Sequence, residues 1–212
     1  MAGQRCTANR RVIVHKHRRD ELLQRLIHES SLLKWGDPLR DDTDIGPLVS
    51  ASHCARVAAA VGRARAECGD PIVPLGARCP PDTDHAERFY PPTILCCDDP
   101  VHEIVQEETF GPVLVVQEAQ DWEHAIRLCN GVRQGLAAAA FTRSPDIVRK
   151  FLEQAEAGIL KINQSTAGAA VDAPFGGWKS SGVGLPEHGP FDLEFFTRPQ
   201  TVYGDTRDKA RC

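Results

Sequence analysis

Cys6 is the first residue of the chain whose type and setting could support covalent chemistry. It stands in Gly3-Gln4-Arg5-Cys6-Thr7-Ala8, just ahead of the β-branched run at residues 11–14. A cysteine thiolate is a strong nucleophile, and the same sulfur leaves readily from an acyl intermediate. The segment is therefore compatible with nucleophilic catalysis, although a buried packing thiol and a chance occurrence are also open for Cys6 taken alone.

Acidic and aromatic residues that could bind a ligand follow at Glu107, Glu108 and Phe110. A carboxylate accepts hydrogen bonds from two hydroxyl groups without needing charge compensation. Further along, Phe175 precedes the pair Gly176-Gly177, where the missing Cβ atoms permit a close turn of the backbone. Solvated loop acids and ordinary core packing of the phenylalanine are the structural alternatives.

The composition is that of a globular protein with a single core. The 212 residues are 42% hydrophobic and 25% charged, and the formal net charge is −4 with both signs interspersed. No broad basic surface for nucleic acid is expected, and no apolar run reaches the roughly 20 residues of a membrane span. A secretory signal is also not evident. We expect a cytoplasmic protein with no nucleic-acid partner and no membrane partner.

The cysteines and histidines do not form a recognisable metal motif. Eight cysteines are present without a Cys-x-x-Cys pair, and the neighbours Cys96 and Cys97 are poorly placed to face one tetrahedral ion. His15 and His17 share one face of an extended chain but have no obvious third ligand. We expect reduced thiols and no metal site.

Short apolar strands alternate with amphipathic helices along the chain. This alternation favours an α/β fold with a mainly parallel sheet flanked by helices. The predicted strands cover residues 11–14, 71–75, 112–116, 136–141 and 159–162, and the predicted helices cover residues 20–27, 50–69, 122–129 and 144–158. Residues 41–48 and 80–84 are expected to form surface loops, and residues 195–203 are expected to form a detached C-terminal strand.

Three separated stretches of the sequence resemble the aldehyde dehydrogenase family. Residues 3–8 resemble its nucleophile segment, residues 106–113 its glutamate-phenylalanine cofactor segment, and residues 174–182 its signature near the C-terminus. Weaker similarity lies at residues 36–38, 44–47 and 158–163. The order and spacing of these stretches across nearly the whole chain make coincidence improbable.

The resemblance implies roles for individual residues. Cys6 matches the catalytic nucleophile, and its own backbone N–H is expected to form part of the oxyanion hole. Glu108 matches the glutamate that holds the nicotinamide ribose, and Phe110 matches the aromatic residue beside the nicotinamide. Phe175 matches a substrate-binding residue at the tunnel mouth, and Asn163 matches a position that tethers the loop under the nucleophile. The implied reaction oxidises an aldehyde to a carboxylic acid with NAD or NADP, through a thiohemiacetal and a thioester.

The resemblance also implies a division of the chain. Residues 1–192 match the catalytic domain, as a partial enzyme, and residues 193–212 match a C-terminal oligomerisation arm and tail. Family members carry the cofactor-binding domain, an oxyanion-hole asparagine and a general-base glutamate upstream of the nucleophile. No Gly-x-Gly-x-x-Gly turn of a dinucleotide site occurs in this sequence. We therefore expect little or no NAD-linked turnover from the chain alone.

Other functions stay open at this point. A truncated homologue could act without catalysis, through association with a full-length homologue or as a homo-oligomer. A cysteine thioesterase would need a histidine partner, and no triad segment provides one. Residues 162–166 faintly resemble enzymes that oxidise semialdehydes of sugar-acid breakdown. The small-molecule aldehyde is otherwise undefined, and the choice between NAD and NADP lies in the upstream domain.

Overall fold

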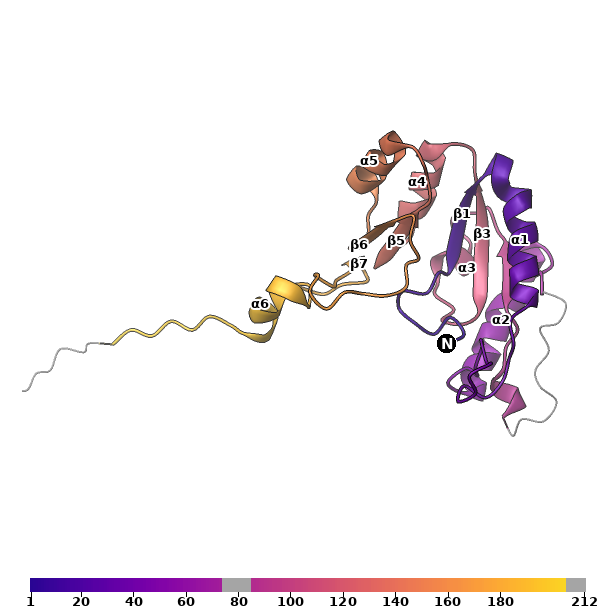
Figure 1. Cartoon of the computed structure of the whole chain (residues 1–212), viewed down its shortest axis with the longest axis horizontal. Coiled ribbons are helices and arrows are strands. Elements are labelled where there is room, and N and C mark those ends of the chain that lie inside the picture. The colour runs from indigo at the N-terminus through magenta and orange to yellow at the C-terminus, as the bar shows by residue number, and fades with distance from the viewer. Residues whose placement is uncertain (74–84, 205–212) are drawn as a thin grey trace, which may run out of the picture.

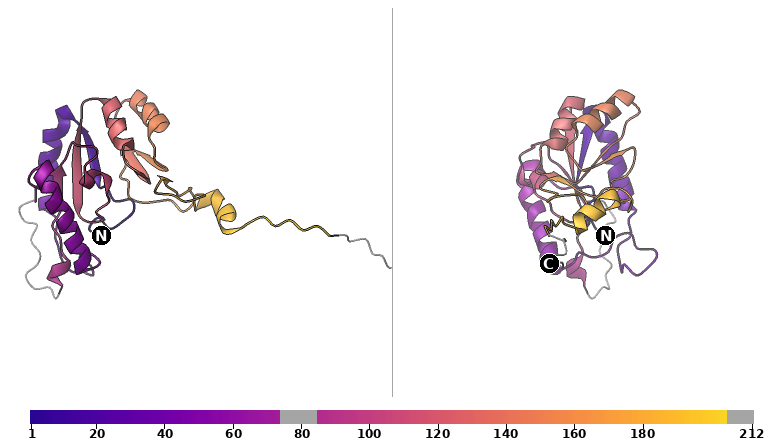
Figure 2. Two further views of the ribbon diagram at one scale, coloured as in Figure 1. Left: turned by 180° about the vertical axis from the view of Figure 1, so that it is seen from behind. Right: turned by 90° about the vertical axis from the view of Figure 1, so that its left-hand side faces the viewer.

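The computed structural model describes residues 1–73 and 85–204. Figures 1 and 2 show a body of sheets and helices, from which the C-terminal segment extends as a long tail. The body has two parts. One is built around a three-stranded sheet, and the other around the strand pair that follows it in the chain.

The three-stranded sheet is parallel, with β3 (Val113–Ala119) between β1 (Arg11–His15) and β2 (Thr93–Cys96). Val115 lies opposite Arg11 on one side and Leu95 on the other. Most residues of β3 are buried, because helices cover both faces of the strand. The predicted fold class, a mainly parallel sheet flanked by helices, is confirmed.

Two long helices cover opposite faces of this sheet. The even-numbered residues Ile94 and Val116 pack against the apolar side chains of α1 (Arg19–Ser31). The odd-numbered Leu95 and Val115 pack against α2 (Ala51–Cys68). Alternation of side chains along a strand produces this division. The Ser50 side chain caps α2 by accepting from the His53 N–H, as a serine before an apolar-periodic run predicts.

The second part of the body pairs β5 (Ala137–Ala140) with β6 (Ile159–Ile162) in parallel. Its helices are α4 (Trp122–Asn130) and α5 (Pro145–Gln154), whose apolar faces meet at Ile126 and Phe151. Ser144 caps α5, because its side-chain oxygen accepts a hydrogen bond from the Ile147 N–H.

The predicted end of α5 at Gly158 is wrong, because the helix stops at Gln154. Gly158 serves another purpose. Its Cα faces the backbone of Gly176 so closely that an added Cβ would collide with the Gly176 carbonyl oxygen. The glycine is required by the approach of two backbones and not by the end of a helix.

Short elements complete the body. β4 (Gln134–Gly135) pairs with β7 (Trp178–Lys179) in antiparallel fashion, and α3 (Glu103–Gln106) precedes the loop that enters β3. The 3-10 turns are η1 (Lys16–Arg18), η2 (Ala86–Arg88) and η3 (Gly189–Phe191). Residues 41–48 form a loop as predicted. Of the predicted strand at residues 71–75, the described part makes a single bridge, Ile72 to Ile94, and residues 80–84 lie outside the described residues.

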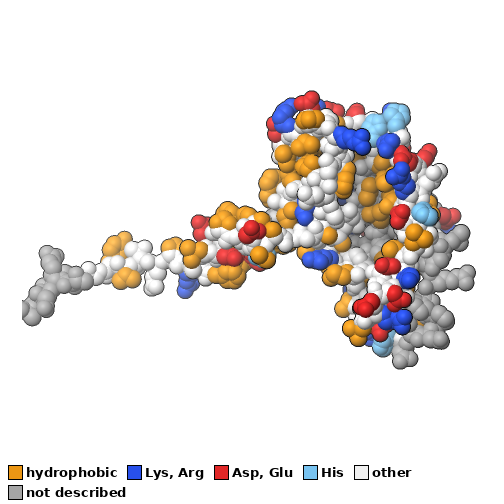
Figure 3. Space-filling view, viewed as in Figure 1, with side chains coloured by type: hydrophobic (Ala, Val, Ile, Leu, Met, Phe, Trp, Pro, Cys, Tyr) orange, Lys and Arg blue, Asp and Glu red, His pale blue; other side chains and the backbone are white. Residues whose placement is uncertain are grey.

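The C-terminal segment differs from the prediction of a strand over residues 195–203. Phe195 and Phe196 belong to α6 (Asp192–Phe196), and residues 201–204 are extended but pair with no strand among the described residues. Val202 and Tyr203 are 80% and 95% exposed. Figure 3 shows hydrophobic side chains along this tail. The predicted boundary between residues 192 and 193 falls at the first turn of α6 and stays a prediction.

The expectation that the cysteines are reduced is wrong for one pair. Cys68 and Cys97 form a disulfide that joins the last residue of α2 to the residue after β2. The two positions are 29 residues apart in the sequence, and only the packing of α2 on the sheet brings them together. The other cysteines of the described residues, Cys6, Cys54, Cys96 and Cys129, are free thiols.

Candidate active site

The Cys6 thiol lies in a tight loop that precedes β1 and is exposed to solvent. Two backbone bonds close the loop, from the Gln4 N–H to Met1 and from the Ala8 N–H to Arg5. The Gln4 side chain anchors it by donating to the Pro47 carbonyl at 3.2 Å and accepting from the Val49 N–H at 2.8 Å. A buried packing role for Cys6 is therefore wrong, and the sulfur is open to a reactant.

The loop of Cys6 and the loop of Glu108 lie at the same edge of the sheet. The first loop enters β1 and the second enters β3, and these neighbouring strands are parallel, so their amino ends meet. Gly3 and Gly111 join the two loops. Gly3 has φ +72°, and an added Cβ would collide with the Gly111 carbonyl oxygen. The fold thus brings two of the three sequence-predicted segments into direct backbone contact.

Glu108 and Phe110 line a pocket of about 300 Å³ between α2 and the loop after α3. The two neighbouring acids differ in their partners. Glu107 forms an ion pair with Arg133 at 2.5 Å, whereas Glu108 is exposed and makes no ion pair among the described residues. Glu108 is therefore the acid whose carboxylate is available to hydroxyl groups of a ligand.

Phe110 is held in an uncommon backbone conformation. Its φ of +52° lies in the left-handed region, which is sterically unfavourable for a bulky residue. The Phe110 carbonyl oxygen lies 2.8 Å from Nε2 of the buried His53, in the first turn of α2. Arg56 donates to the other ring nitrogen, Nδ1, at 3.0 Å. Since a guanidinium only donates, the proton of a neutral His53 is on Nε2, and this N–H holds the Phe110 carbonyl.

Sequence reasoning missed His53 and Arg56 as parts of this pocket. Both residues line it together with Glu108 and Phe110. Their spacing of three along a helix was the available signal, since it places both side chains on one helix face. This spacing does not show where that helix face lies relative to the Glu108–Phe110 loop, which is more than fifty residues away in the sequence.

Arg10 and Gln134 fix the backbone that presents Glu108. The Arg10 guanidinium donates to the carbonyl oxygens of Val105 and Glu107 at 2.8 and 2.9 Å and to Oε1 of Gln134 at 2.9 Å. Gln134 in turn donates to the Gln106 carbonyl at 3.0 Å. Burial lowers the pKa of Arg10, and the nearby Glu108 and Glu107 carboxylates act in the opposite direction. Three consecutive carbonyl groups immediately before Glu108 are thereby held in place.

A threonine, and not Asn163, secures the loop after the nucleophile. The hydroxyl of buried Thr166 lies 2.7 Å from the Thr7 carbonyl oxygen and 2.6 Å from Oδ1 of Asn9. Asn163 instead makes two hydrogen bonds with the backbone of Thr142, both at 2.9 Å. The prediction that Asn163 tethers the nucleophile loop is therefore wrong, because its side chain joins the ends of β5 and β6.

Phe175 is half-buried in the glycine-rich C-terminal segment. Its backbone pairs with Glu187 through bonds of 2.6 and 2.9 Å, and its ring lies 5.7 Å from the ring of His188. These contacts stay within residues 175–188 and do not join Phe175 to the loops of Cys6 and Glu108. A substrate-binding role for Phe175 stays a prediction.

Comparison with known proteins agrees with this arrangement. A family model described as the aldehyde dehydrogenase family matches residues 1–202. The alpha-ketoglutarate semialdehyde dehydrogenase of Haloferax volcanii is 35% identical over 202 residues, which cover 95% of this chain and 41% of that protein. A betaine aldehyde dehydrogenase of Cereibacter sphaeroides is also 35% identical, with 95% and 40% covered. The chain belongs to the aldehyde dehydrogenase family.

Solved structures extend the comparison to the fold. A crystal structure of betaine aldehyde dehydrogenase from Staphylococcus aureus in complex with NAD⁺ matches with a TM-score of 0.80 and 31% identity, over 88% of this chain and 37% of that one. A double mutant of the same enzyme matches with a TM-score of 0.83, at 31% identity and over 95% and 41% of the chains. The chain spans about two fifths of the length of these relatives. None of the described helices combines the length and apolar character needed to cross a bilayer.

Proposed function

We propose that this chain is the catalytic-domain portion of an NAD(P)-dependent aldehyde dehydrogenase, with Cys6 as its nucleophile. The observation that carries the proposal is the contact between the loops of Cys6 and Glu108 through Gly3 and Gly111. This contact joins the loop that carries an exposed thiol to the loop that carries the Glu108 carboxylate, which makes no ion pair among the described residues. Family membership supports the same assignment.

In the proposed reaction, the Cys6 thiolate attacks the aldehyde carbon and forms a thiohemiacetal. The Cys6 backbone N–H donates to the oxygen that becomes negative in this step. Loss of hydride from the same carbon leaves a thioester on Sγ, and water then releases the carboxylic acid. Sulfur suits both halves, because it attacks as a thiolate and departs readily from an acyl group.

The residues of the pocket fit one part of a nicotinamide dinucleotide. Glu108 would hold the ribose hydroxyls, Phe110 would lie beside the nicotinamide ring, and the Arg56 guanidinium offers a cation near both. A pocket of about 300 Å³ lies at the lower end of the range for small-molecule sites, which suits the ribose and not the whole dinucleotide. When bound, NAD or NADP supplies the hydride acceptor. Phe175 is proposed as a substrate contact.

The substrate of this chain is proposed only as a class, a small-molecule aldehyde. The Haloferax relative is named for a semialdehyde, which agrees with the resemblance of residues 162–166 to semialdehyde enzymes. The relatives named betaine aldehyde dehydrogenases point to a different aldehyde. Competition between a semialdehyde and betaine aldehyde for Cys6 would separate the two. Action in the cytoplasm stays a prediction.

The reactivity of Cys6 tests the proposal without requiring turnover. We expect an activated ester to acylate Cys6, and NAD⁺ at high concentration to slow alkylation of the same sulfur by iodoacetamide. Peptide mass spectrometry measures both, with Cys54 as the internal comparison, since that thiol is only partly exposed. Glu108→Gln should weaken protection by NAD⁺, because a neutral amide is a poorer acceptor for the ribose hydroxyls. Equal alkylation rates with and without NAD⁺ would contradict the proposal.

A second candidate function is association without catalysis. It is favoured by the extended residues 201–204, which are exposed and pair with no strand among the described residues. Unpaired extended segments with apolar side chains promote pairing with another chain. We expect a homo-oligomer, or a complex with a full-length homologue, that is lost when residues 197–212 are removed. A monomer at high concentration in sedimentation equilibrium, or a Cys6→Ser variant with an altered phenotype, would count against association as the whole function.

A further inference from the structure

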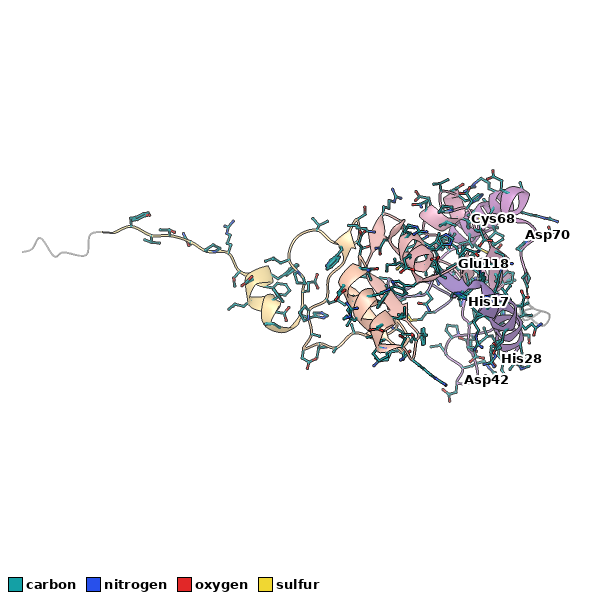
Figure 4. The ribbon with its side chains drawn as sticks, turned by 90° about the horizontal axis from the view of Figure 1, so that it is seen from above. His17, His28, Asp42, Cys68, Asp70 and Glu118 are labelled. Atoms are coloured by element: carbon teal, nitrogen blue, oxygen red, sulfur yellow. A yellow bond between two sulfur atoms is a disulfide. The ribbon has the colours of Figure 1, made fainter. Side chains whose placement is uncertain are left out.

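A second cluster of reactive side chains lies away from Cys6, at the far end of α2. It consists of Cys68, Cys97 and His102, whose sulfur atoms and one ring nitrogen all lie within 4.8 Å of one another. Figure 4 shows Cys68 at the end of its helix, close to Asp70. The proposed dehydrogenase chemistry does not use these residues. Two uses fit them chemically, a metal site and a thiol–disulfide pair.

The backbone presents the two sulfurs to each other. Cys97 continues the alternation of β2 and points into the core on the α2 side, with Val61 and Ala64. Cys96 points to the opposite face and packs near Val14 and Ile94. The Cα atoms of Cys68 and Cys97 lie 4.8 Å apart, within the range that a disulfide spans. The pairing therefore needs no rearrangement of either element.

The hydrogen bonding of His102 decides between the two uses. His102 is the N-cap of α3, and its Nδ1 accepts the Ile104 N–H at 3.0 Å in a buried setting. The proton of the neutral ring is therefore on Nε2, which faces Glu67 at 3.4 Å. A metal ion on Nε2 would require this proton to move to Nδ1, where it would oppose the Ile104 N–H. The hydrogen bond to the Ile104 N–H thus leaves Nε2 as a donor, and it disfavours His102 as a metal ligand.

We propose that Cys68 and Cys97 form a reversible disulfide that exchanges with thiols in solution, with Cys68 as the sulfur under attack. Cys68 is partly exposed, whereas Cys97 is only 3% exposed. An attacking thiolate forms a mixed disulfide with Cys68 and displaces Cys97 as a thiolate. The Nε2–H of His102 stabilises that thiolate by donating a hydrogen bond, and a proton then comes from water. A second thiol of the reductant releases Cys68, so that one dithiol is oxidised and one disulfide is reduced.

Oxidation follows the reverse course with a low-molecular-weight disulfide as the oxidant. The Cys68 thiolate attacks one sulfur of that disulfide and forms a mixed disulfide, which releases the first thiol. The Cys97 thiolate then attacks Cys68 and releases the second thiol. Two thiols of the former oxidant are released as one protein disulfide forms. The link closes between α2 and β2, and α2 carries at its other end the His53 side chain that holds Phe110.

Thiol trapping at defined ratios of reduced to oxidised glutathione tests the proposal. The full chain is equilibrated, alkylated and mapped by mass spectrometry under non-reducing conditions. We expect a peptide pair linked through Cys68 and Cys97 that disappears with excess dithiothreitol and returns with oxidised glutathione. Cys96→Ser is the matched control, since Cys96 is adjacent in sequence but lies on the other face, and it should leave the titration unchanged.

A second variant tests the role of His102. His102→Asn keeps a side-chain acceptor for the Ile104 N–H and removes the ring donor beside the sulfurs. We expect its disulfide to be reduced about threefold to tenfold more slowly, as the loss of one hydrogen bond to the leaving thiolate implies. An unchanged rate would overturn the part assigned to His102. Failure of the linked peptide to form at any glutathione ratio, or stoichiometric zinc that blocks alkylation of both cysteines, would overturn the proposed exchange.

Discussion

The Nε2 of His53 lies 2.8 Å from the carbonyl oxygen of Phe110, so the first turn of α2 holds the backbone of the residue proposed to lie beside the nicotinamide. The pairing matters because Phe110 has a left-handed backbone conformation. Such a conformation persists only where surrounding contacts impose it. We regard His53 as a positioning residue for the Glu108–Phe110 loop.

Replacement of this histidine should loosen the loop. His53→Ala removes the donor to the part-buried carbonyl of Phe110, which should cost about 1 kcal/mol in the free energy of unfolding. Urea denaturation measures this loss. Protection of Cys6 by NAD⁺ should weaken in the same variant, and His53→Gln, which keeps a side-chain donor, should recover part of it. Full protection by NAD⁺ in His53→Ala would contradict a positioning role.

The contact between Gly3 and Gly111 predicts that a methyl group added at Gly3 lowers the free energy of unfolding. Gly3→Ala should destabilise the protein by about 3 kcal/mol, because a left-handed residue acquires a Cβ that also collides with a backbone oxygen. Gly168→Ala is the matched control. Gly168 also has a positive φ, of +82°, but an added Cβ would meet no atom within 4 Å. Its cost should be only about 1–2 kcal/mol in the same denaturation experiment. Equal losses would show that the loops do not touch.

The bonds of Arg10 predict that lysine cannot replace it. Arg10→Lys keeps the charge but loses the planar group that reaches the Val105 and Glu107 carbonyls together, so we expect a loss of roughly 2 kcal/mol. The same substitution at the exposed Arg127 should be neutral within about 0.5 kcal/mol. NAD⁺ protection of Cys6 reports whether Glu108 has moved. A fully stable Arg10→Lys variant would exclude this anchoring of the loop.

The thiol of Cys129 predicts a fall in stability at high pH. Burial raises its pKa above the ordinary value of 9.0, while Arg11 and Lys179 act in the opposite direction. A thiol whose pKa is raised by folding keeps its proton in the native state, while the same thiol ionises in the unfolded state. Ionisation therefore stabilises the unfolded state relative to the native state as the pH rises above about 9. The unfolding free energy should therefore decline over that range. Cys129→Ala should flatten the decline, and an identical slope in both proteins would exclude this thiol as its source.

The parallel sheet could be predicted because its strands and helices each follow a strong local pattern. The run at residues 112–116 is continuously apolar, as a strand covered on both faces requires, and it became the central strand β3. By contrast, β2 is short and is flanked by prolines and aspartates, which favour loops. Its sequence therefore did not predict a strand. Phe195 and Phe196 suggested a strand by residue type, yet they form the last turn of α6.

The site was predictable only as separate segments. The resemblance suggested Cys6, Glu108 and Phe110 as site residues, and their roles stay predictions. The parallel arrangement of β1 and β3 explains why their loops meet. The supporting contacts were not predictable, because Arg10, His53 and Thr166 act on residues that are more than fifty positions away. The disulfide was missed for the same reason. Sequence spacing gave no sign that the end of α2 would pass over Cys97.

The close passage of Gly158 over Gly176 has a consequence for protein engineering. The two backbone segments touch at Gly158 and Gly176, so neither position has a side chain that could be varied. Any other amino acid at Gly158 would push the segments apart. Substitutions that probe the proposed substrate contact are better placed at a neighbour that carries a side chain, such as Phe175, while Gly158 and Gly176 are kept unchanged.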